Sequence, residues 1–336
     1  MEKTALVTGA NGFIGSHLAT ELVERGFFVY GLHRRERSNN PLYNKYVKEG
    51  KIKPILQDVK NLNINDLPKV EYVFHIAGKV SVWGKLKEFR QINVLGTKKL
   101  LEYAKVCRVK CFTYLSSSAV YGFYGYKNIQ EDAPKKPFKN PYPITKLEAE
   151  NEVASFCKNE GMPYVIIRPC NVFGEYDYTS SHEIYTRVKN GKMMISAGGK
   201  YESCFVYVKN LVEAILHTAF TKTAQNQDYN VSDGNETLKE YLTMVANAFN
   251  VKPKFTNFAK PLAKLTACLV EGVYKILFIK KAPIITRFTV YQNCTHYSFS
   301  TKKLKSVGYE KKYSMEQGVK NTANWIEEVL KSETKN

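Results

Sequence analysis

The stretch that decides the fold reads Ala5-Leu6-Val7-Thr8-Gly9-Ala10-Asn11-Gly12-Phe13-Ile14-Gly15. Its apolar start predicts a strand, and the apolar spacing from Phe13 onward predicts a helix after a glycine-rich turn. Gly9 permits the tight turn, Gly12 lets the backbone approach a pyrophosphate, and Gly15 allows close packing of helix on strand. The helix N-terminus would face the phosphate charge. An ordinary strand-to-helix turn is the plain alternative, but the placement favours a dinucleotide site that also includes Asn11, Phe13 and Ile14.

Outward from this turn, short apolar runs alternate with longer helical patterns, as in a parallel sheet with crossover helices. The expected strands are 3–8, 28–32, 52–56, 71–76, 111–116 and 163–168, and the expected helices are 13–25, 85–107 and 142–159. Later helices are expected near 181–190, 209–220, 237–250, 262–279 and 314–331. We therefore expect an α/β fold with a doubly wound parallel sheet over 1–170, onto which parts of 205–235 pack back. A smaller, mostly helical substrate lobe over 171–336 follows.

Composition narrows the class of protein. The formal net charge is +19, and residues 251–336 hold 16 Lys+Arg against 6 Asp+Glu. Such an excess of positive charge is typical of proteins that bind nucleic acids, anionic membranes or phosphorylated ligands, although a solvated surface explains it most simply. Seven Cys without a CxxC pair predict reduced thiols in the cytoplasm and no metal site. We expect no signal peptide, because the first strand starts almost at once.

The end of the second strand discriminates between cofactors. An acidic residue there would bind the ribose 2′-hydroxyl of NAD(H), whereas an arginine accommodates the 2′-phosphate of NADP(H). This sequence has His33, Arg34 and Arg35 at that place. We therefore favour NADP(H), with NAD(H) as the alternative; the arginines as plain surface charge are the simpler interpretation.

A candidate catalytic set follows the fifth strand. Tyr142 and Lys146 are four residues apart at a helix start, which puts both on one face. A neighbouring ammonium stabilises a phenolate and so makes the tyrosine a better acid/base at neutral pH. Ser116, Ser117 and Ser118 stand where the strand 111–116 ends, at the edge where doubly wound sheets bind ligands.

In this order, the glycine loop, the strand-end Ser and the Tyr-x-x-x-Lys pair resemble the short-chain dehydrogenase/reductase superfamily. The chain is most similar to its extended branch, the NAD-dependent epimerase/dehydratase superfamily, over nearly its whole length. The resemblance implies a Rossmann-type fold with Tyr142 as general acid/base and Lys146 lowering the pKa of Tyr142. Ser117, three residues before Val120, would hydrogen-bond the substrate oxygen. Tyr142 and Lys146 would also contact the cofactor.

Further segments match that branch. Asn93, in Asn93-Val94-Leu95-Gly96-Thr97, resembles the residue that positions the active-site lysine through water. The resemblance adds to the cofactor site Asp58, Val59, Ile76, Ala77, Gly78, Pro169, Asn171 and Val172. It adds to the substrate site Lys79, Ser118, Asn171 and Tyr207. It also implies a homodimer formed through helices 85–107 and 142–159.

Two reaction types in the branch fit the sequence less well. Sugar-nucleotide 4,6-dehydratases of this family carry Asp and Glu where this chain has Ser118 and Ala119, so water elimination is disfavoured. Sugar-nucleotide epimerases use an Arg for the diphosphate where this chain has Ser203. Lys200 is a substitute candidate, which leaves epimerisation open.

The C-terminal lobe is similar instead to 3β-hydroxysteroid dehydrogenase-like and dihydroflavonol reductase-like relatives, which act on bulky apolar molecules. Tyr291, Tyr297 and Phe299 would suit an apolar pocket wall, although core packing is the more common role of such residues. The helix expected over 262–279 is amphipathic and lysine-flanked, so it covers a globular lobe or a dimer partner, or rests peripherally on a membrane.

We therefore predict an oxidoreductase, cytoplasmic or else membrane-peripheral, that interconverts a ketone and a secondary alcohol on a small hydrophobic substrate. The substrate would be sterol-like, 3-oxoacyl-like or flavonoid-like. A nucleotide-sugar epimerase or reductase is the alternative enzyme. A catalytically silent NADP-binding regulator or an RNA-binding protein is the alternative of another class. We expect no nucleic-acid partner, because such proteins often lack the catalytic Tyr or Lys and this chain has both Tyr142 and Lys146.

Overall fold

The computed structural model describes residues 3–34 and 36–333. Its centre is a seven-stranded sheet in the order β10-β6-β5-β4-β1-β2-β3, and every neighbouring pair is parallel. The strands are β1 (Lys3–Thr8), β2 (Phe27–His33), β3 (Ile52–Leu56), β4 (Tyr72–His75), β5 (Cys111–Leu115), β6 (Tyr164–Pro169) and β10 (Gln227–Val231). The chain order reverses between β1 and β4, which is where doubly wound sheets open a ligand crevice. The predicted α/β fold is confirmed.

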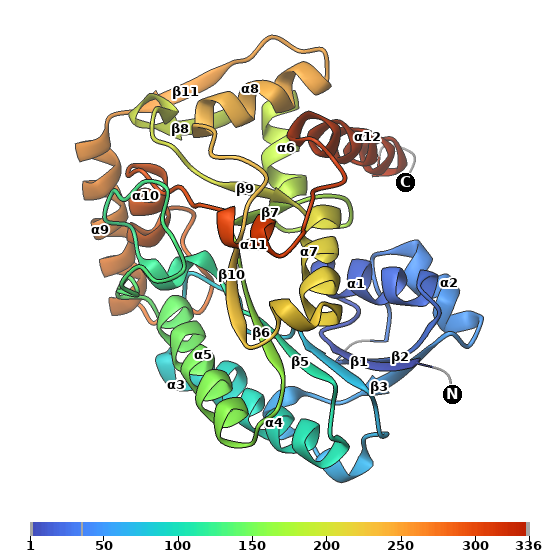
Figure 1. The fold of residues 1–336 in the computed structure, drawn as a ribbon. Helices are drawn as coiled ribbons and strands as arrows, with labels where there is room; N and C mark the ends of the chain where they lie inside the picture. The colour runs from blue at the N-terminus through green and yellow to red at the C-terminus, as the bar shows by residue number, and fades with distance from the viewer. Residues whose placement is uncertain (1–2, 35, 334–336) are drawn as a thin grey trace.

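Helices cover both faces of this sheet (Figure 1). One face packs against α1 (Phe13–Glu24), α2 (Pro41–Lys48) and α7 (Val208–Phe220), and the other against α4 (Gly96–Cys107) and α5 (Pro141–Asn159). The expected helix 85–107 is interrupted, because α3 (Leu86–Phe89) continues as a π-helix over Arg90–Leu95 before α4 begins. Neither α2 nor β10 was among the expected elements.

The remaining elements form a lobe above the carboxyl edge of the sheet (Figure 1). It contains β7 (Asn171–Phe173) paired with β9 (Phe205–Tyr207), and β8 (Met193–Ser196) paired with β11 (Phe255–Phe258). Its helices are α6 (Ser181–Lys189), α8 (Leu238–Ala248), α9 (Lys260–Ile276), α10 (Arg287–Asn293) and α12 (Met315–Glu333). The short α11 (Lys302–Ser306) packs instead beside β10, with Leu304 in the core of the sheet. A core of its own, built around Tyr185, Leu242 and Ile326, supports this lobe.

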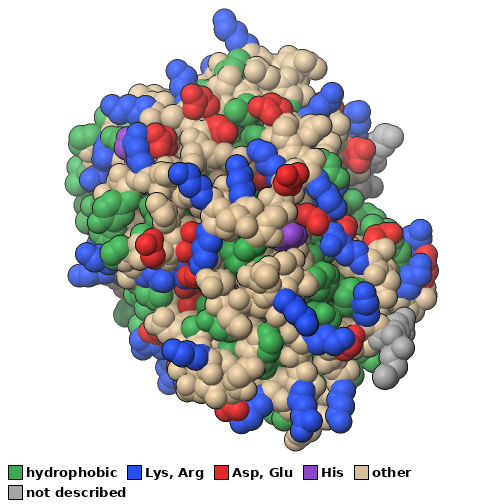
Figure 2. Space-filling model, viewed as in Figure 1, with side chains coloured by type: hydrophobic (Ala, Val, Ile, Leu, Met, Phe, Trp, Pro, Cys, Tyr) green, Lys and Arg blue, Asp and Glu red, His purple; other side chains and the backbone are tan. Residues whose placement is uncertain are grey.

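Charged side chains of both signs are spread over the face shown in Figure 2. Apolar side chains gather along its left edge, where Figure 1 places α9. Among the described residues, no helix is long and apolar enough to cross a bilayer.

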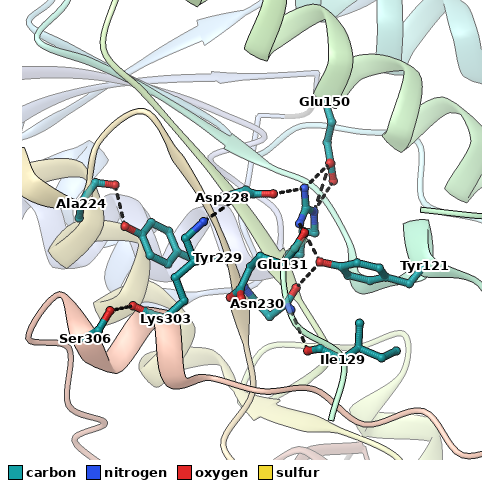
Figure 3. A network of polar contacts seen from close by, with 11 residues as sticks. Tyr121, Ile129, Glu131, Glu150, Ala224, Asp228, Tyr229, Asn230, Lys303 and Ser306 are labelled. Carbon is teal, nitrogen blue, oxygen red and sulfur yellow. Dashed lines mark hydrogen bonds and ion pairs between the residues drawn. The ribbon is translucent and has the colours of Figure 1, made fainter. Parts of the chain in front are cut away.

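A buried charge network joins the sheet to α5. Arg168, on β6, is 1% exposed, and its Nε and Nη2 donate to the Glu150 carboxylate at 2.8–3.1 Å. Its guanidinium also forms an ion pair with Asp228 of β10, and its Nη1 donates to the Tyr121 hydroxyl at 2.7 Å. Figure 3 shows Glu150, Asp228 and Tyr121 pointing toward one place between their elements. The network therefore ties α5 to two strands at the sheet's edge.

We expect Arg168→Met to lower the free energy of unfolding by about 3–5 kcal/mol, because Glu150 would be left buried without its cation. Urea unfolding followed by circular dichroism measures the change. Arg90→Met is the matched control, because Arg90 pairs with Glu148, which lies on α5 as Glu150 does. Half of the Arg90 side chain is exposed, so the loss of unfolding free energy should stay below about 1 kcal/mol. The double variant Glu150→Met/Arg168→Met should lose less than Arg168→Met alone. Equal losses in Arg168→Met and Arg90→Met would contradict this account.

Candidate active site

The glycine turn leaves a helix terminus open for an anion. Gly9 has φ +67°, and a Cβ on Gly15 would lie 2.1 Å from the Gly9 carbonyl oxygen, so neither position accepts a larger residue without rearrangement. No side chain caps the N-terminus of α1, and no acid stands in its first turn. The first-turn amides are thus without a side-chain cap, and the helix dipole favours negative charge there. The turn fits the pyrophosphate of a dinucleotide.

The end of β2 lies next to this turn, and β3 pairs with β2. His33 is buried against the Tyr43 ring, whereas Arg34 is two-thirds exposed. The Arg34 guanidinium lies 3.8 Å from the Asp58 carboxylate, which also accepts a hydrogen bond from the Lys60 amide. Arg34 and Asp58, both predicted to bind the cofactor, are therefore neighbours. Arg35 lies outside the described residues.

Lys146 is a buried ammonium at the end of β5. Asn140 caps α5 by accepting from the Tyr142 amide at 2.9 Å, and one turn later the Lys146 Nζ donates to the Leu115 carbonyl at 2.7 Å. The same Nζ lies 4.8 Å from the centre of the Tyr114 ring. Burial lowers the pKa of Lys146 to about 8, although the negative charge of Glu150 opposes the shift. The lysine therefore titrates close to the physiological range.

Tyr142 lies half-buried beside Ser117. Burial raises the pKa of its phenol, and a hydrogen bond with the Ser117 side chain acts in the opposite direction. Ser117 itself begins the 3-10 turn Ser118–Tyr121 and accepts from the Ala119 amide at 3.2 Å. Ser116, in contrast, points to α5 and donates to Glu150. The structure thus brings Ser117, rather than Ser116, to the tyrosine.

The π-helix presents Asn93 to the same place. Its side-chain oxygen accepts from the Lys79 amide at 2.7 Å, and its Nδ2 donates to the Thr145 hydroxyl at 3.0 Å. A Cβ on Gly78 would meet the Lys146 Nζ at 3.2 Å and the Asn93 side-chain oxygen at 3.3 Å. Lys146 and Asn93 therefore converge under the Gly78 backbone. Single π-helical turns are often found at functional sites.

A buried polar chain behind these residues was missed by the sequence analysis. The amides of Ile76 and Ala77 donate to the Thr8 hydroxyl, and that hydroxyl is 2.8 Å from His75 Nδ1. His75 Nε2 is 2.9 Å from the Thr97 hydroxyl, which donates to the Asn93 carbonyl at 2.6 Å. Because Thr97 uses its proton on Asn93, we assign the imidazole proton to Nε2 and the acceptor role to Nδ1.

This chain fixes the loop after β4 and the π-helix relative to β1. None of these residues stands out in the sequence, because the hydrogen bonds join positions that are far apart in the chain. Burial, helped by the charge of Lys146, lowers the pKa of His75 to about 3, so the imidazole is neutral in the folded protein at pH 7.

The side chains predicted to bind the substrate do not form one cluster. Lys79 pairs with Glu88 at 2.6 Å, and Ser118 is buried in the 3-10 turn. Asn171 donates to the Ser203 hydroxyl and the Cys204 carbonyl and accepts from Gln292. Pro169 and Val172 lie beside it at the end of β6 and in β7.

Tyr207 does not join this group. It is fully buried in the lobe, with its hydroxyl 2.9 Å from the Glu175 carboxylate. Tyr297 and Phe299 are likewise core residues, 2% and 1% exposed, which agrees with the simpler of the two roles considered for them. Their aromatic side chains are used for packing rather than for an open pocket wall.

Comparison with known proteins places this geometry in a family. The family model described as "NAD dependent epimerase/dehydratase family" matches residues 5–232. The chain is 28% identical to a dTDP-D-glucose 4,6-dehydratase of Mus musculus, over 96% of this chain and 88% of the relative. It is 26% identical to a 4-hydroxy-2-methyl-3-oxo-4-farnesyl-3,4-dihydroquinoline-1-oxide ketoreductase of Stigmatella aurantiaca, over 93% of each chain.

Among solved structures, the UDP-glucose 4-epimerase of Thermotoga maritima with UDP-glucose superposes with a TM-score of 0.78 at 22% identity. The match covers 97% of this chain and 99% of the epimerase. The protein is an extended short-chain dehydrogenase/reductase and belongs to the NAD dependent epimerase/dehydratase family. It is an oxidoreductase that works with a nicotinamide dinucleotide.

We expect acid to destabilise the protein partly through His75. Its pKa is about 3 when folded and near 6.5 when unfolded, so between these values the unfolded chain binds more protons and stability falls as the pH falls. Between pH 7.5 and pH 5.0 this group alone should cost about 2 kcal/mol. Urea unfolding of wild type and His75→Asn at both pH values measures it. The variant should be less stable at pH 7.5 but lose less on acidification; equal losses in both proteins would contradict the assignment.

Proposed function

We propose that the protein interconverts a ketone and a secondary alcohol on a hydrophobic substrate and prefers NADP(H). The observation that carries this proposal is the surroundings of Tyr142. Its ring packs against an aromatic cluster between the sheet and the lobe, whose buried part includes Phe123, Phe288 and Tyr297. Val82, Phe138 and Tyr291 are the half-buried members next to this core. An apolar substrate that reached Tyr142 would contact these half-buried side chains beside the reacting carbonyl, while the buried aromatics support them from behind.

The polar groups around Tyr142 suit proton delivery to a carbonyl oxygen. Tyr142 gives its proton to the oxygen, while the Ser117 hydroxyl holds that oxygen as negative charge develops. The Lys146 ammonium stabilises the phenolate that remains, and Asn93 supports resupply of the proton. A nicotinamide bound at the glycine turn would supply the hydride for the carbonyl carbon.

The cofactor preference is supported by Arg34. Its guanidinium is exposed at the end of β2, where a 2′-phosphate would lie, and His33 leaves no carboxylate at that strand end. The nearby Asp58 pairs with Arg34 in the structure, so a phosphate would compete with that carboxylate for the guanidinium.

A nucleotide-sugar epimerase or reductase is the second candidate, because both the dehydratase relative and the epimerase structure act on or bind nucleotide sugars. The local residues favour it less. Ser203 is buried and bonded to Asn171 at the position where epimerases carry an Arg, and a charge-assisted contact to a diphosphate is worth roughly 1.5–3 kcal/mol. Lys200, with its ammonium 5.8 Å from the Tyr201 ring, is the remaining cation nearby in sequence.

We expect NADPH-dependent turnover with 3-oxoacyl compounds or sterol ketones, and none with UDP- or GDP-sugars. Tyr142→Phe should lower kcat/KM by about 10²–10⁴-fold, because the proton donor is lost. Absorbance of NADPH measures the rate, and Tyr178→Phe, which changes an exposed tyrosine on the lobe, is the control and should keep full activity. Undiminished turnover by Tyr142→Phe would refute the mechanism, and tight binding of a UDP-sugar would favour the second candidate.

We expect Arg34→Ser to reduce kcat/KM with NADPH by about 10–100-fold and to leave the value with NADH nearly unchanged, because one charge-assisted contact to the 2′-phosphate disappears. Steady-state kinetics with both cofactors measure the ratio. Arg90→Ser, another exposed arginine, is the control. A wild-type enzyme that prefers NADH would refute the proposed role of Arg34.

A further inference from the structure

Helix α9 is packed with its apolar side outward. Leucine, valine and isoleucine side chains at helical spacing form one stripe, and each is 51–75% exposed: Leu262, Leu265, Leu269, Val273 and Ile276. The side that faces the protein carries Ala263, Ala267 and Glu271. A helix that merely covers a globular lobe has the reverse arrangement.

The inward side fixes this orientation. Glu271 is buried and accepts hydrogen bonds from the Arg287 amide and guanidinium, both at 2.7 Å. Ala263 and Ala267 pack closely against Val290 and Cys294. Rotating the helix to bury its leucines would break the Glu271 contacts and bring larger side chains into a space filled by alanines. The packing of α9 therefore fixes its apolar stripe on the outside of the protein.

The apolar surface continues past the end of the helix. Phe278 is 88% exposed and Ile284 is 85% exposed, and both follow α9 in the chain. The indole of Trp83 holds this segment by donating to the Ile279 carbonyl at 3.0 Å. We call the stripe, together with Leu277, Phe278 and Ile284, the α9 surface. Figure 2 shows apolar side chains with lysines and arginines among them at the left edge, where Figure 1 places α9.

The charges around the α9 surface are almost all positive. Residues 259–287 contain six basic residues, Lys260, Lys264, Lys275, Lys280, Lys281 and Arg287, and a single acidic one, the buried Glu271. From the neighbouring α3, Glu88 lies close to Lys280 but is paired with Lys79. A second copy of the chain seated on this surface would place like charges face to face. An anionic lipid layer offers both an apolar interior and opposite charge.

We propose that the α9 surface lies on the surface of an anionic phospholipid bilayer, with the leucine stripe and Phe278 in the headgroup region. The described helices cannot span a bilayer, so the contact is peripheral. Trp83, which holds this segment, lies five residues after Gly78 in the chain. The proposal stands independently of the proposed function, and its test needs no substrate.

Flotation with vesicles tests the proposal on the full-length protein. Wild type should float with vesicles of phosphatidylcholine and phosphatidylglycerol at 7:3, and at least fivefold less with phosphatidylcholine alone or in high salt. Leu269→Gln/Phe278→Gln should lose most of the binding, as should Lys275→Glu/Lys280→Glu/Lys281→Glu. Because all five side chains are largely exposed, the variants should fold as wild type does, which circular dichroism checks.

Two matched controls separate the α9 surface from general effects. Leu42→Gln/Val106→Gln changes exposed apolar residues elsewhere, and Lys48→Glu/Lys222→Glu/Lys305→Glu makes the same change in net charge on other elements. Both should bind vesicles as wild type does. No flotation of wild type, or equal flotation of control and α9 variants, would overturn the proposal. A concentration-dependent dimer that Leu269→Gln/Phe278→Gln abolishes would also overturn it, by assigning the surface to a second copy.

Discussion

The candidate active site depends on a lysine whose charge is buried. An ammonium away from water is costly unless opposite charge is near, and burial indeed brings the pKa of Lys146 down to about 8. A series of charged side chains of alternating sign leads from Lys146 toward the surface. Glu150 follows Lys146 by one turn, Arg168 binds Glu150, Asp228 binds Arg168, and Lys303 binds Asp228 at 3.0 Å near the surface. Figure 3 shows the part of this series from Glu150 outward.

The same ion pairs link α5, β6 and β10 to one another. Tyr142 and Lys146 share α5 with Glu150, so the ion pairs help to hold the two proposed catalytic side chains in place. On the opposite side, the His75 chain holds the π-helix and therefore Asn93. Two buried polar networks, one on each side of Lys146, thus position the side chains to which we assign proton transfer.

Much of the fold follows from local sequence patterns. The glycine turn, the alternation of strands and helices, and the Tyr142–Lys146 spacing are short-range signals, and the sheet order agrees with them. The eight-residue α2 and the five-residue β10 are short, so few positions carry their pattern and they were not expected. Tyr207 looked available for substrate, but the sequence could not show that its hydroxyl is bonded to Glu175 inside the lobe. The outward rotation of α9 is likewise a tertiary effect, set by the buried Glu271.

Transfer of a hydrogen label tests the central claim most directly. The enzyme is incubated with NADPH that carries deuterium at C4 and with a 3-oxoacyl or sterol ketone, and the product is examined by mass spectrometry. The account predicts one deuterium on the new carbinol carbon, formed by wild type and lost in Tyr142→Phe. Conversion of a UDP-sugar to its C4 epimer without net use of cofactor, and no labelled alcohol from any of the ketones, would contradict it.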